Sequence, residues 1–207
     1  MTYAFLKSEK PSVKICGLIE EEHVAAAVAA GADAIGFVFA PNSPRNIDRT
    51  LADQLLLQLP SEVLPVAVLQ NYGDLQDFSN WPGWLQLCGE EDMDTISSSP
   101  RPVIKAVQWS KDTVLEWDNC KGIEAILVDG STGGLGKMFN VSELASLRPS
   151  LQKPIIVAGG LTAATVSEVI LTVQPAAVDV SSGVESSRGV KDPFRICEFI
   201  EAAIGTN

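Results

Sequence analysis

Residues 154–183 read PIIVAGGLTAATVSEVILTVQPAAVDVSSG and have the pattern of one strand–helix–strand unit. Residues 154–158 and 177–180 are short apolar runs, which are typical of strands covered on both faces. Between them, residues 162–173 predict a helix, because apolar side chains recur at intervals of three and four positions. These apolar side chains are Val166, Val169, Ile170 and Val173. Two strands joined through such a helix predict a parallel pair with a right-handed crossover.

The same alternation runs outward from this unit to both ends of the chain. Further strands are expected at residues 13–16, 34–39, 63–69, 84–87, 103–107 and 123–128. Helices are expected at residues 20–30, 51–59, 111–117, 141–147 and 192–204, with weaker helical segments at 74–78 and 91–96. Gly31 is expected to end the first helix. Asp192 is expected to cap the last helix, with Pro193 at its first position.

Eight strand–helix units of roughly 25 residues each predict an α/β fold, a compact (β/α)8 TIM barrel with eight parallel strands. An open doubly wound sheet is the alternative. It favours fewer strands and a Gly-x-Gly-x-x-Gly loop after the first strand, and no such loop follows residues 13–16. No linker divides the chain. Residues 1–207 are therefore expected to form a single domain, with a short N-terminal extension at 1–11.

The composition argues against several classes of function. The chain has 207 residues, 46% hydrophobic and 20% charged, so it can bury a sizeable core. Its net charge of −11 argues against nucleic acid and anionic membranes as partners, because both attract clustered Lys and Arg. Residues 1–10 lack the apolar segment of a signal peptide, and no apolar run is long enough to span a bilayer. We therefore expect a cytoplasmic protein that binds any anionic ligand through local donors.

Histidine and cysteine usage limits the chemistry further. His23 is the single histidine, which excludes a two-His metal centre, and its place on a helix predicts a surface or packing role. The cysteines are Cys16, Cys88, Cys120 and Cys197, and they form no Cys-x-x-Cys pair or zinc pattern. They are expected to be free thiols in a reducing compartment. No two-His or zinc site is therefore expected.

The chemistry of TIM barrels lies at the carboxyl ends of the strands. Cys16 ends the first expected strand, and it is either a small buried hydrophobe or a general base or nucleophile. Lys14 shares its face if that strand is regular. Asp129 ends the sixth strand, where a carboxylate either caps a loop or exchanges a proton with a substrate. Asp179, near the end of the eighth strand, is expected to order the loop that follows.

Two loops have the composition of a phosphate site. Gly159-Gly160 follows the seventh strand and Ser181-Ser182-Gly183 the eighth, and backbone N–H groups in such loops can bind phosphate without a basic side chain. The alternative for each loop is an ordinary tight turn. Arg45, after the second strand, is either a solvated surface residue or a ligand of a substrate carboxylate. Residues 133–136, including Gly134, are either a lid with backbone donors or a plain linker.

Several motifs follow one another along almost the whole chain. They are Lys14-Ile15-Cys16-Gly17, residues 31–39, Ser43-Pro44-Arg45, Leu85-Gln86-Leu87, Leu127-Val128-Asp129, Gly133-Gly134 with Gly136, Ala158-Gly159-Gly160-Leu161, residues 178–185 and Gly189-Val190-Lys191-Asp192. Taken in this order, they resemble the phosphoribosylanthranilate isomerase family of tryptophan biosynthesis. The opening motif and the closing motif are the most specific ones, whereas glycine loops alone would not identify a family.

The resemblance implies an isomerase that uses no cofactor. The reaction is an Amadori rearrangement of N-(5′-phosphoribosyl)anthranilate to 1-(o-carboxyphenylamino)-1-deoxyribulose 5-phosphate. The resemblance also implies that Cys16 is the general base, that Asp129 is the general acid and that Arg45 binds the anthranilate carboxylate. The residues implied for phosphate binding are Gly159, Gly160, Ser182 and Gly183. Further candidates for the same pocket are Lys14, Cys88, Gly134, Asp179 and Ser181.

The chain departs from the family pattern at several points. Cys88 stands where the family has histidine, Leu135 stands where its lid has threonine, and no aromatic residue closely follows Phe139. The N-terminal extension is also longer than is usual. The missing imidazole and hydroxyl are expected to change substrate affinity or rate. The alternatives are the related aminoaldose isomerase of histidine biosynthesis, against which Cys16 argues, and a non-catalytic sugar-phosphate-binding barrel. The oligomeric state, monomer or homodimer, is left open.

Overall fold

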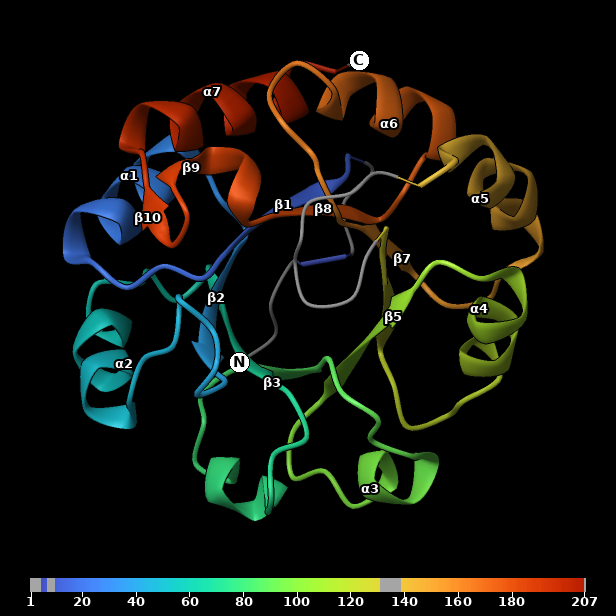
Figure 1. Ribbon diagram of the computed structural model, residues 1–207, viewed down its shortest axis with the longest axis horizontal. Coiled ribbons are helices and arrows are strands. Elements are labelled where there is room, and N and C mark those ends of the chain that lie inside the picture. Colours follow the sequence, from blue (N-terminus) through green and yellow to red (C-terminus); the bar gives the residue numbers. More distant parts are fainter. Residues whose placement is uncertain (1–4, 7–9, 131–138, 207) are drawn as a thin grey trace.

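The structure is a computed structural model that describes residues 5–6, 10–130 and 139–206. Its centre is a closed barrel in which strands β1 to β8 follow one another in chain order and every neighbouring pair is parallel (Figure 1). The strands are β1 Ser12–Cys16, β2 Ala34–Phe39, β3 Leu64–Leu69, β4 Trp84–Leu87, β5 Val103–Gln108, β6 Ala125–Asp129, β7 Ile155–Val157 and β8 Ala177–Val180. The predicted TIM barrel is confirmed.

Helices surround the barrel on its outside (Figure 1). The α-helices are α1 Glu21–Ala30, α2 Arg49–Leu56, α3 Met93–Ser97, α4 Lys111–Asp118, α5 Val141–Leu147, α6 Val166–Val173 and α7 Pro193–Ile204. The 3-10 helices are η1 Leu75–Phe78, η2 Arg148–Ser150 and η3 Ser182–Val184. The predicted ends are confirmed for α1, where Gly31 has a φ of 97°, and for α7, where the Asp192 carboxylate accepts from two backbone N–H groups. Within the described residues, no helix is long and apolar enough to cross a membrane.

Two predicted helices differ from their bounds in the structure by three or four positions at one end. The helix expected at 162–173 begins only at Val166, because the Thr165 hydroxyl accepts from the Thr162 N–H and holds the preceding residues in a turn. The helix expected at 51–59 is shifted towards the N-terminus, because the Asp48 carboxylate accepts from the Leu51 N–H and caps it. In both cases a polar side chain sets the helix start, which the apolar pattern does not record.

A short antiparallel hairpin after β8 was not predicted. It consists of β9 Glu185–Ser187 and β10 Val190–Lys191, and it lies outside the barrel sheet. Its residues are mostly polar and do not alternate over the length that predicts a strand. The hairpin follows η3 at the carboxyl end of β8, so it brings its side chains to the end of the barrel where chemistry is expected.

Alternation along the strands divides the core into two clusters. In β2, the side chains of Ile35, Phe37 and Phe39 belong to the outer cluster, which packs between the barrel and the helices. Those of Ala34 and Val38 belong to the inner cluster, which fills the barrel. Because the side-chain period of a strand is two, the residues that share a face with Cys16 also share the barrel interior.

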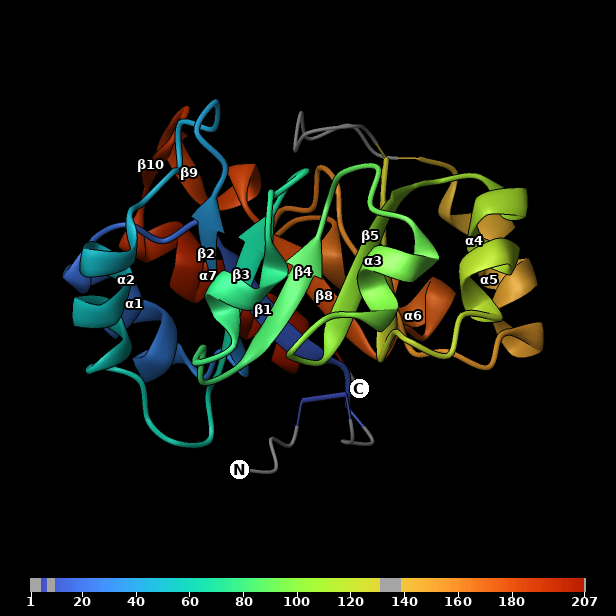
Figure 2. The same ribbon diagram turned by 90° about the horizontal axis from the view of Figure 1, so that it is seen from below.

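The N-terminal extension contributes Phe5 to the inner cluster. Its side chain is 2% exposed and packs edge-to-face on Trp84, with ring centroids 5.9 Å apart. The same cluster contains Ala34, Leu64 and Ala177, which are the first residues of their strands. Phe5 therefore closes the amino-terminal end of the barrel, and Figure 2 shows its segment at the end opposite the strand tips.

Replacing Phe5 by alanine is expected to lower the free energy of unfolding by about 3 kcal/mol, because it removes a buried ring and leaves a cavity. The measurement is urea unfolding followed by circular dichroism. Leu57, whose side chain is 87% exposed, supplies the matched control. The Leu57→Ala change is expected to cost less than about 0.5 kcal/mol. A loss for Phe5→Ala as small as that of the control would show that the extension does not seal the barrel.

Candidate active site

The predicted loops and carboxylates line one cavity at the carboxyl end of the barrel. Its lining consists of Asp129, residues 158–161 and residues 179–183. The structure thus brings together both predicted glycine loops and both predicted strand-end aspartates. The two loops approach closely, since a Cβ at Gly183 would collide with the Leu161 carbonyl oxygen. Only glycine allows this approach, so Gly183 lets the loop after β8 pack directly against the loop after β7.

Cys16 is the last residue of β1 and points into the barrel. Its side chain is 6% exposed and belongs to the inner cluster. Gly36 is its register partner on β2, and a Cβ there would lie 2.9 Å from Cys16 Sγ and 3.1 Å from Lys14 Nζ. The thiol and the ammonium group therefore meet in the space that Gly36 leaves open. Lys14 and Cys16 share a face, as predicted.

Charges around Cys16 act on its thiol in opposite directions. Burial raises the pKa of Cys16, and the Asp179 carboxylate adds to this rise. Lys14 and Lys191 act in the opposite direction and lower the pKa, but the net shift is upward. Lys14 is fully buried, and its Nζ lies 2.7 Å from Asp179 Oδ1. Burial alone would lower the pKa of Lys14, but Asp179 and Cys16 outweigh it, so this pKa is raised and the side chain is charged. Lys191 is a second basic neighbour that the sequence did not reveal.

Asp129 ends β6, as predicted, and is half-buried in the lining of the cavity. In the closed barrel, β7 and β8 separate β6 from β1. The loops of these two strands carry Gly159-Gly160 and Ser181-Ser182-Gly183, so they lie between the carboxylate of Asp129 and the thiol of Cys16. This order places the two candidate phosphate-binding loops between a candidate acid and a candidate base.

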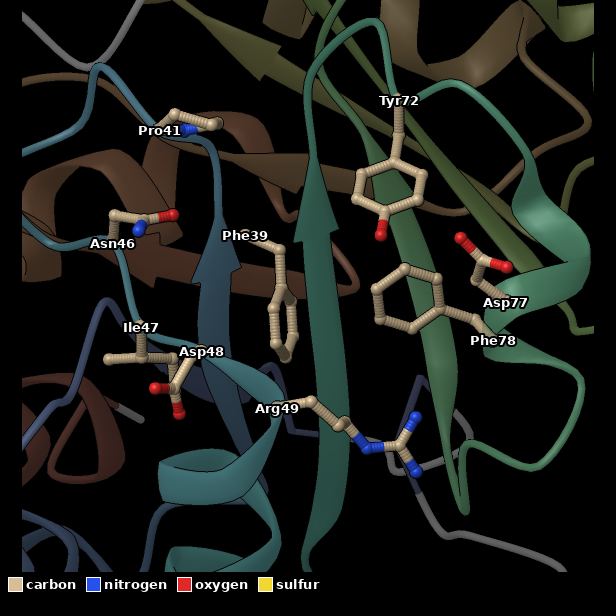
Figure 3. Close-up of a pocket in the computed structure, with 9 residues that line it drawn as sticks. All are labelled: Phe39, Pro41, Asn46, Ile47, Asp48, Arg49, Tyr72, Asp77 and Phe78. Carbon is tan, nitrogen blue, oxygen red and sulfur yellow. The ribbon is translucent and has the colours of Figure 1, made fainter.

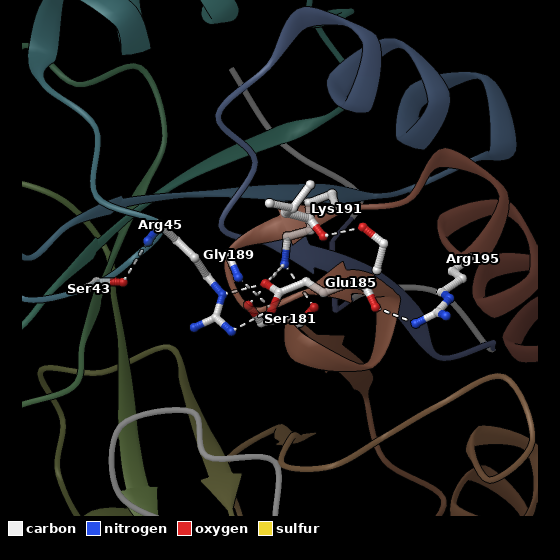
Figure 4. A network of polar contacts seen from close by, with 9 residues as sticks. Ser43, Arg45, Ser181, Glu185, Gly189, Lys191 and Arg195 are labelled. Atoms are coloured by element: carbon white, nitrogen blue, oxygen red, sulfur yellow. Dashed lines mark hydrogen bonds and ion pairs between the residues drawn. The ribbon is translucent and has the colours of Figure 1, made fainter.

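Arg45 is buried, which rules out the alternative of a solvated surface residue. It lies in the loop between β2 and α2, and a Cβ at Gly17 would come 2.6 Å from its Cδ. Its Nε donates to Glu185 Oε1 over 2.6 Å and its Nη2 to Glu185 Oε2 over 3.0 Å (Figure 4). The aliphatic part of the Arg45 side chain therefore packs beside Gly17, the residue that follows Cys16, and its guanidinium group is held by Glu185. Glu185 was quoted in a motif but given no role by the sequence.

Cys88 follows β4 and is held by Gln86, whose Nε2 lies 3.3 Å from the Cys88 sulfur. Burial raises the pKa of Cys88 to about 12, so the thiol is protonated at neutral pH. It therefore cannot replace the charge or the basicity of an imidazole. His23 lies on α1 rather than on a strand and is buried, which fits the packing role of the two that were expected. Gly134 lies outside the described residues.

A larger cavity, of about 500 Å³, lies elsewhere (Figure 3). It is lined by Phe39, Pro41, Asn46, Ile47, Asp48, Arg49, Tyr72, Asp77 and Phe78. Phe39 belongs to the outer cluster, so this cavity lies outside the barrel, and it contains none of the predicted site residues. Size alone does not make it the functional site. In the part of the chain that the structure describes, no group of three or more His, Cys, Asp or Glu side chains could hold a metal ion.

The carboxyl end of this closed parallel barrel carries an ionisable thiol, a carboxylate and two glycine loops. These features define a class of protein: TIM barrels that can carry out acid–base chemistry on an anionic ligand. The chain matches the family model of N-(5′-phosphoribosyl)anthranilate isomerase over residues 13–202. It therefore belongs to the phosphoribosylanthranilate isomerase family, as its motifs predict.

Individual relatives agree with this assignment. The isomerase of Chromohalobacter salexigens is 40% identical over 200 residues, which cover 93% of each chain. The crystal structure of phosphoribosyl anthranilate isomerase from Thermotoga maritima has a TM-score of 0.85 and 36% identity, and covers 94% of this chain and 99% of that one. A further isomerase structure, solved with reduced 1-(o-carboxyphenylamino)-1-deoxyribulose 5-phosphate, has a TM-score of 0.83 and 34% identity, with coverage of 94% and 99%.

Proposed function

We propose that this chain isomerises N-(5′-phosphoribosyl)anthranilate, with Cys16 as the general base and Asp129 as the general acid. The observation that carries the proposal is the position of these two groups. They end β1 and β6 of one barrel, and the glycine loops of β7 and β8 lie between them. A phosphate bound in those loops would hold a ribose so that its two faces meet the thiol and the carboxylate.

Two proton transfers lead to the enolamine. Asp129 donates a proton to the ribose ring oxygen as the C1′–oxygen bond breaks, and the anthranilate nitrogen supplies the electron pair that forms the Schiff base. The Cys16 thiolate next removes the proton from C2′, and those electrons move towards the positively charged nitrogen. The resulting enolamine tautomerises to the ketone as its C2′ hydroxyl loses a proton and C1′ gains one, and exchange with water returns Cys16 to the thiolate and Asp129 to the acid. The electron sink forms within the substrate, so the proposal requires no cofactor.

Binding is assigned to the groups around this pair. Gly159, Gly160, Ser182 and Gly183 hold the phosphate, since glycine loops can aim backbone N–H groups at an anion. Arg45 binds the anthranilate carboxylate through its guanidinium group. The remaining pocket candidates are Lys14, Cys88, Gly134, Asp179 and Ser181. A cytoplasmic location, a monomeric or homodimeric state and the absence of nucleic-acid binding stay predictions from the sequence.

The test is turnover of phosphoribosylanthranilate, which is generated in place from anthranilate and phosphoribosyl pyrophosphate by a coupling transferase. We expect loss of substrate fluorescence well above the spontaneous-decay blank. A folded protein without turnover would overturn the proposal. If that protein still bound the reduced product analogue, the non-catalytic sugar-phosphate-binding barrel would replace it.

The rate is expected to depend on pH through Cys16. The base acts as a thiolate and burial raises its pKa, so the rising limb of kcat/KM lies at higher pH than an ordinary cysteine, whose pKa is about 8.5, would place it. Where Asp129 is still protonated, kcat/KM below the midpoint of this limb rises about tenfold per pH unit. The measurement is kcat/KM from pH 5 to 9, corrected for substrate decay, together with the pH dependence of Cys16 alkylation, which reports the thiol alone. Alkylation that follows a pKa at or below about 8.5 would contradict the prediction.

A further inference from the structure

Glu185 is the centre of a buried polar network at the carboxyl end of the barrel (Figure 4). Its side chain is 4% exposed and contacts both Arg45 and Lys191. The Gly189 N–H donates to Glu185 Oε2 over 3.0 Å, and Arg195 Nη1 donates to the Glu185 carbonyl oxygen. The carboxylate is thus held in place by a backbone N–H of its own hairpin, β9–β10, and it also binds Arg45 from a loop that is distant in sequence.

The contact uses one edge of the Arg45 guanidinium group. A guanidinium carries five N–H donors in a planar fork. Glu185 accepts from Nε and from Nη2, which together form the side-on edge. The end-on edge, formed by Nη1 and the second N–H of Nη2, points away from Glu185 (Figure 4). A carboxylate ligand can therefore bind the end-on edge while Glu185 holds the side-on edge.

Lys191 keeps this cluster positive and joins it to the phosphate loop. Its Nζ lies 3.0 Å from Glu185 Oε1, 2.8 Å from the Ser181 carbonyl oxygen and 3.1 Å from Ser181 Oγ. One carboxylate between two cations leaves a net charge of about +1, which favours an anionic ligand. Ser181 lines the same cavity as Gly183. The network therefore connects Arg45, where the substrate carboxylate is expected, with the loop where the phosphate is expected.

We propose that Glu185 is a positioning residue, which orients Arg45 so that its free edge binds the carboxylate of the substrate, while Lys191 ties this arrangement to the loop after β8. The inference rests on the proposed function, because it concerns how that substrate is recognised. Glu185 itself does not touch the substrate. Its removal is therefore expected to weaken binding more than it slows the chemical step.

The Glu185→Gln change tests this role. It is expected to raise KM for phosphoribosylanthranilate about tenfold, the worth of a charge-assisted hydrogen bond, while kcat changes less than about threefold. The Asp53→Asn change is the control, because it removes the carboxylate of an exposed ion pair with Arg49. It should leave both constants unchanged. An unchanged KM in Glu185→Gln, or a fall in kcat without a rise in KM, would overturn the proposal.

A double-mutant cycle separates positioning from other effects. In an Arg45→Ala background, Glu185→Gln is expected to raise KM no further, because the group it orients is gone. An equal rise in both backgrounds would show that Glu185 does not act through Arg45. If Glu185→Gln does not fold, Glu185→Asp keeps the charge beside Lys191 but is too short to hold both cations. It should show the same KM increase and the same dependence on Arg45. Wild-type protein without turnover would instead overturn the proposed function.

Discussion

Replacing Cys16 by alanine is expected to lower kcat by about a thousandfold or more, because it removes the only group assigned to take the C2′ proton. The phosphate loops and Arg45 are untouched by this change, so binding of the product is expected to persist. The measurement is single-turnover kinetics of the variant, together with titration of the product. Loss of turnover with binding retained is the signature of a base rather than a binding residue.

Two comparisons make the Cys16 result specific. Cys197 lies on α7, outside the barrel, so Cys197→Ala is a control for the loss of a thiol and should leave kcat unchanged. Cys16→Ser keeps a small polar side chain, but its hydroxyl is a far weaker base than a thiolate, so it should be nearly as inactive as alanine. Turnover that survives Cys16→Ala would keep the isomerase assignment and remove the proposed mechanism.

The fold could be predicted because its elements are local. Each barrel strand is an apolar run bounded by turn residues, and the alternation of strands with helices leaves few topologies. The helix ends at Gly31 and Asp192 were predicted for the same reason, since capping depends on neighbouring residues. The predicted starts of α2 and α6 were wrong because single polar contacts, from Asp48 and Thr165, decide them.

The candidate site was predicted only in part, because its contacts join residues far apart in the chain. Strand-end positions identified Cys16 and Asp129, but the pairing of Lys14 with Asp179 requires the barrel to close between β1 and β8. The bond from Arg45 to Glu185 spans 140 positions and depends on a hairpin without a strand pattern. Residue types at strand ends therefore predict which groups lie at the carboxyl end of the barrel. They do not predict which of these groups form hydrogen bonds or ion pairs with one another.

Replacing Asp129 by asparagine is expected to lower kcat about 10²- to 10⁴-fold, the usual contribution of a general acid. The amide has nearly the same shape as a protonated carboxyl group but releases no proton to the ring oxygen. KM is therefore expected to change little. The measurement is steady-state kinetics, with the exposed Asp53→Asn change as the control for a lost carboxylate. A raised KM with an unchanged kcat would assign Asp129 to binding instead.

The double variant Cys16→Ala/Asp129→Asn decides whether the two groups serve successive steps of one reaction. Ring opening by Asp129 precedes proton removal by Cys16, so the slower step alone limits the rate once either group is lost. The combined loss in kcat should then lie close to the larger of the two single losses and well below their product. A loss equal to the product would mean that both groups stabilise the same transition state, and the two-step assignment would have to be replaced by a concerted one.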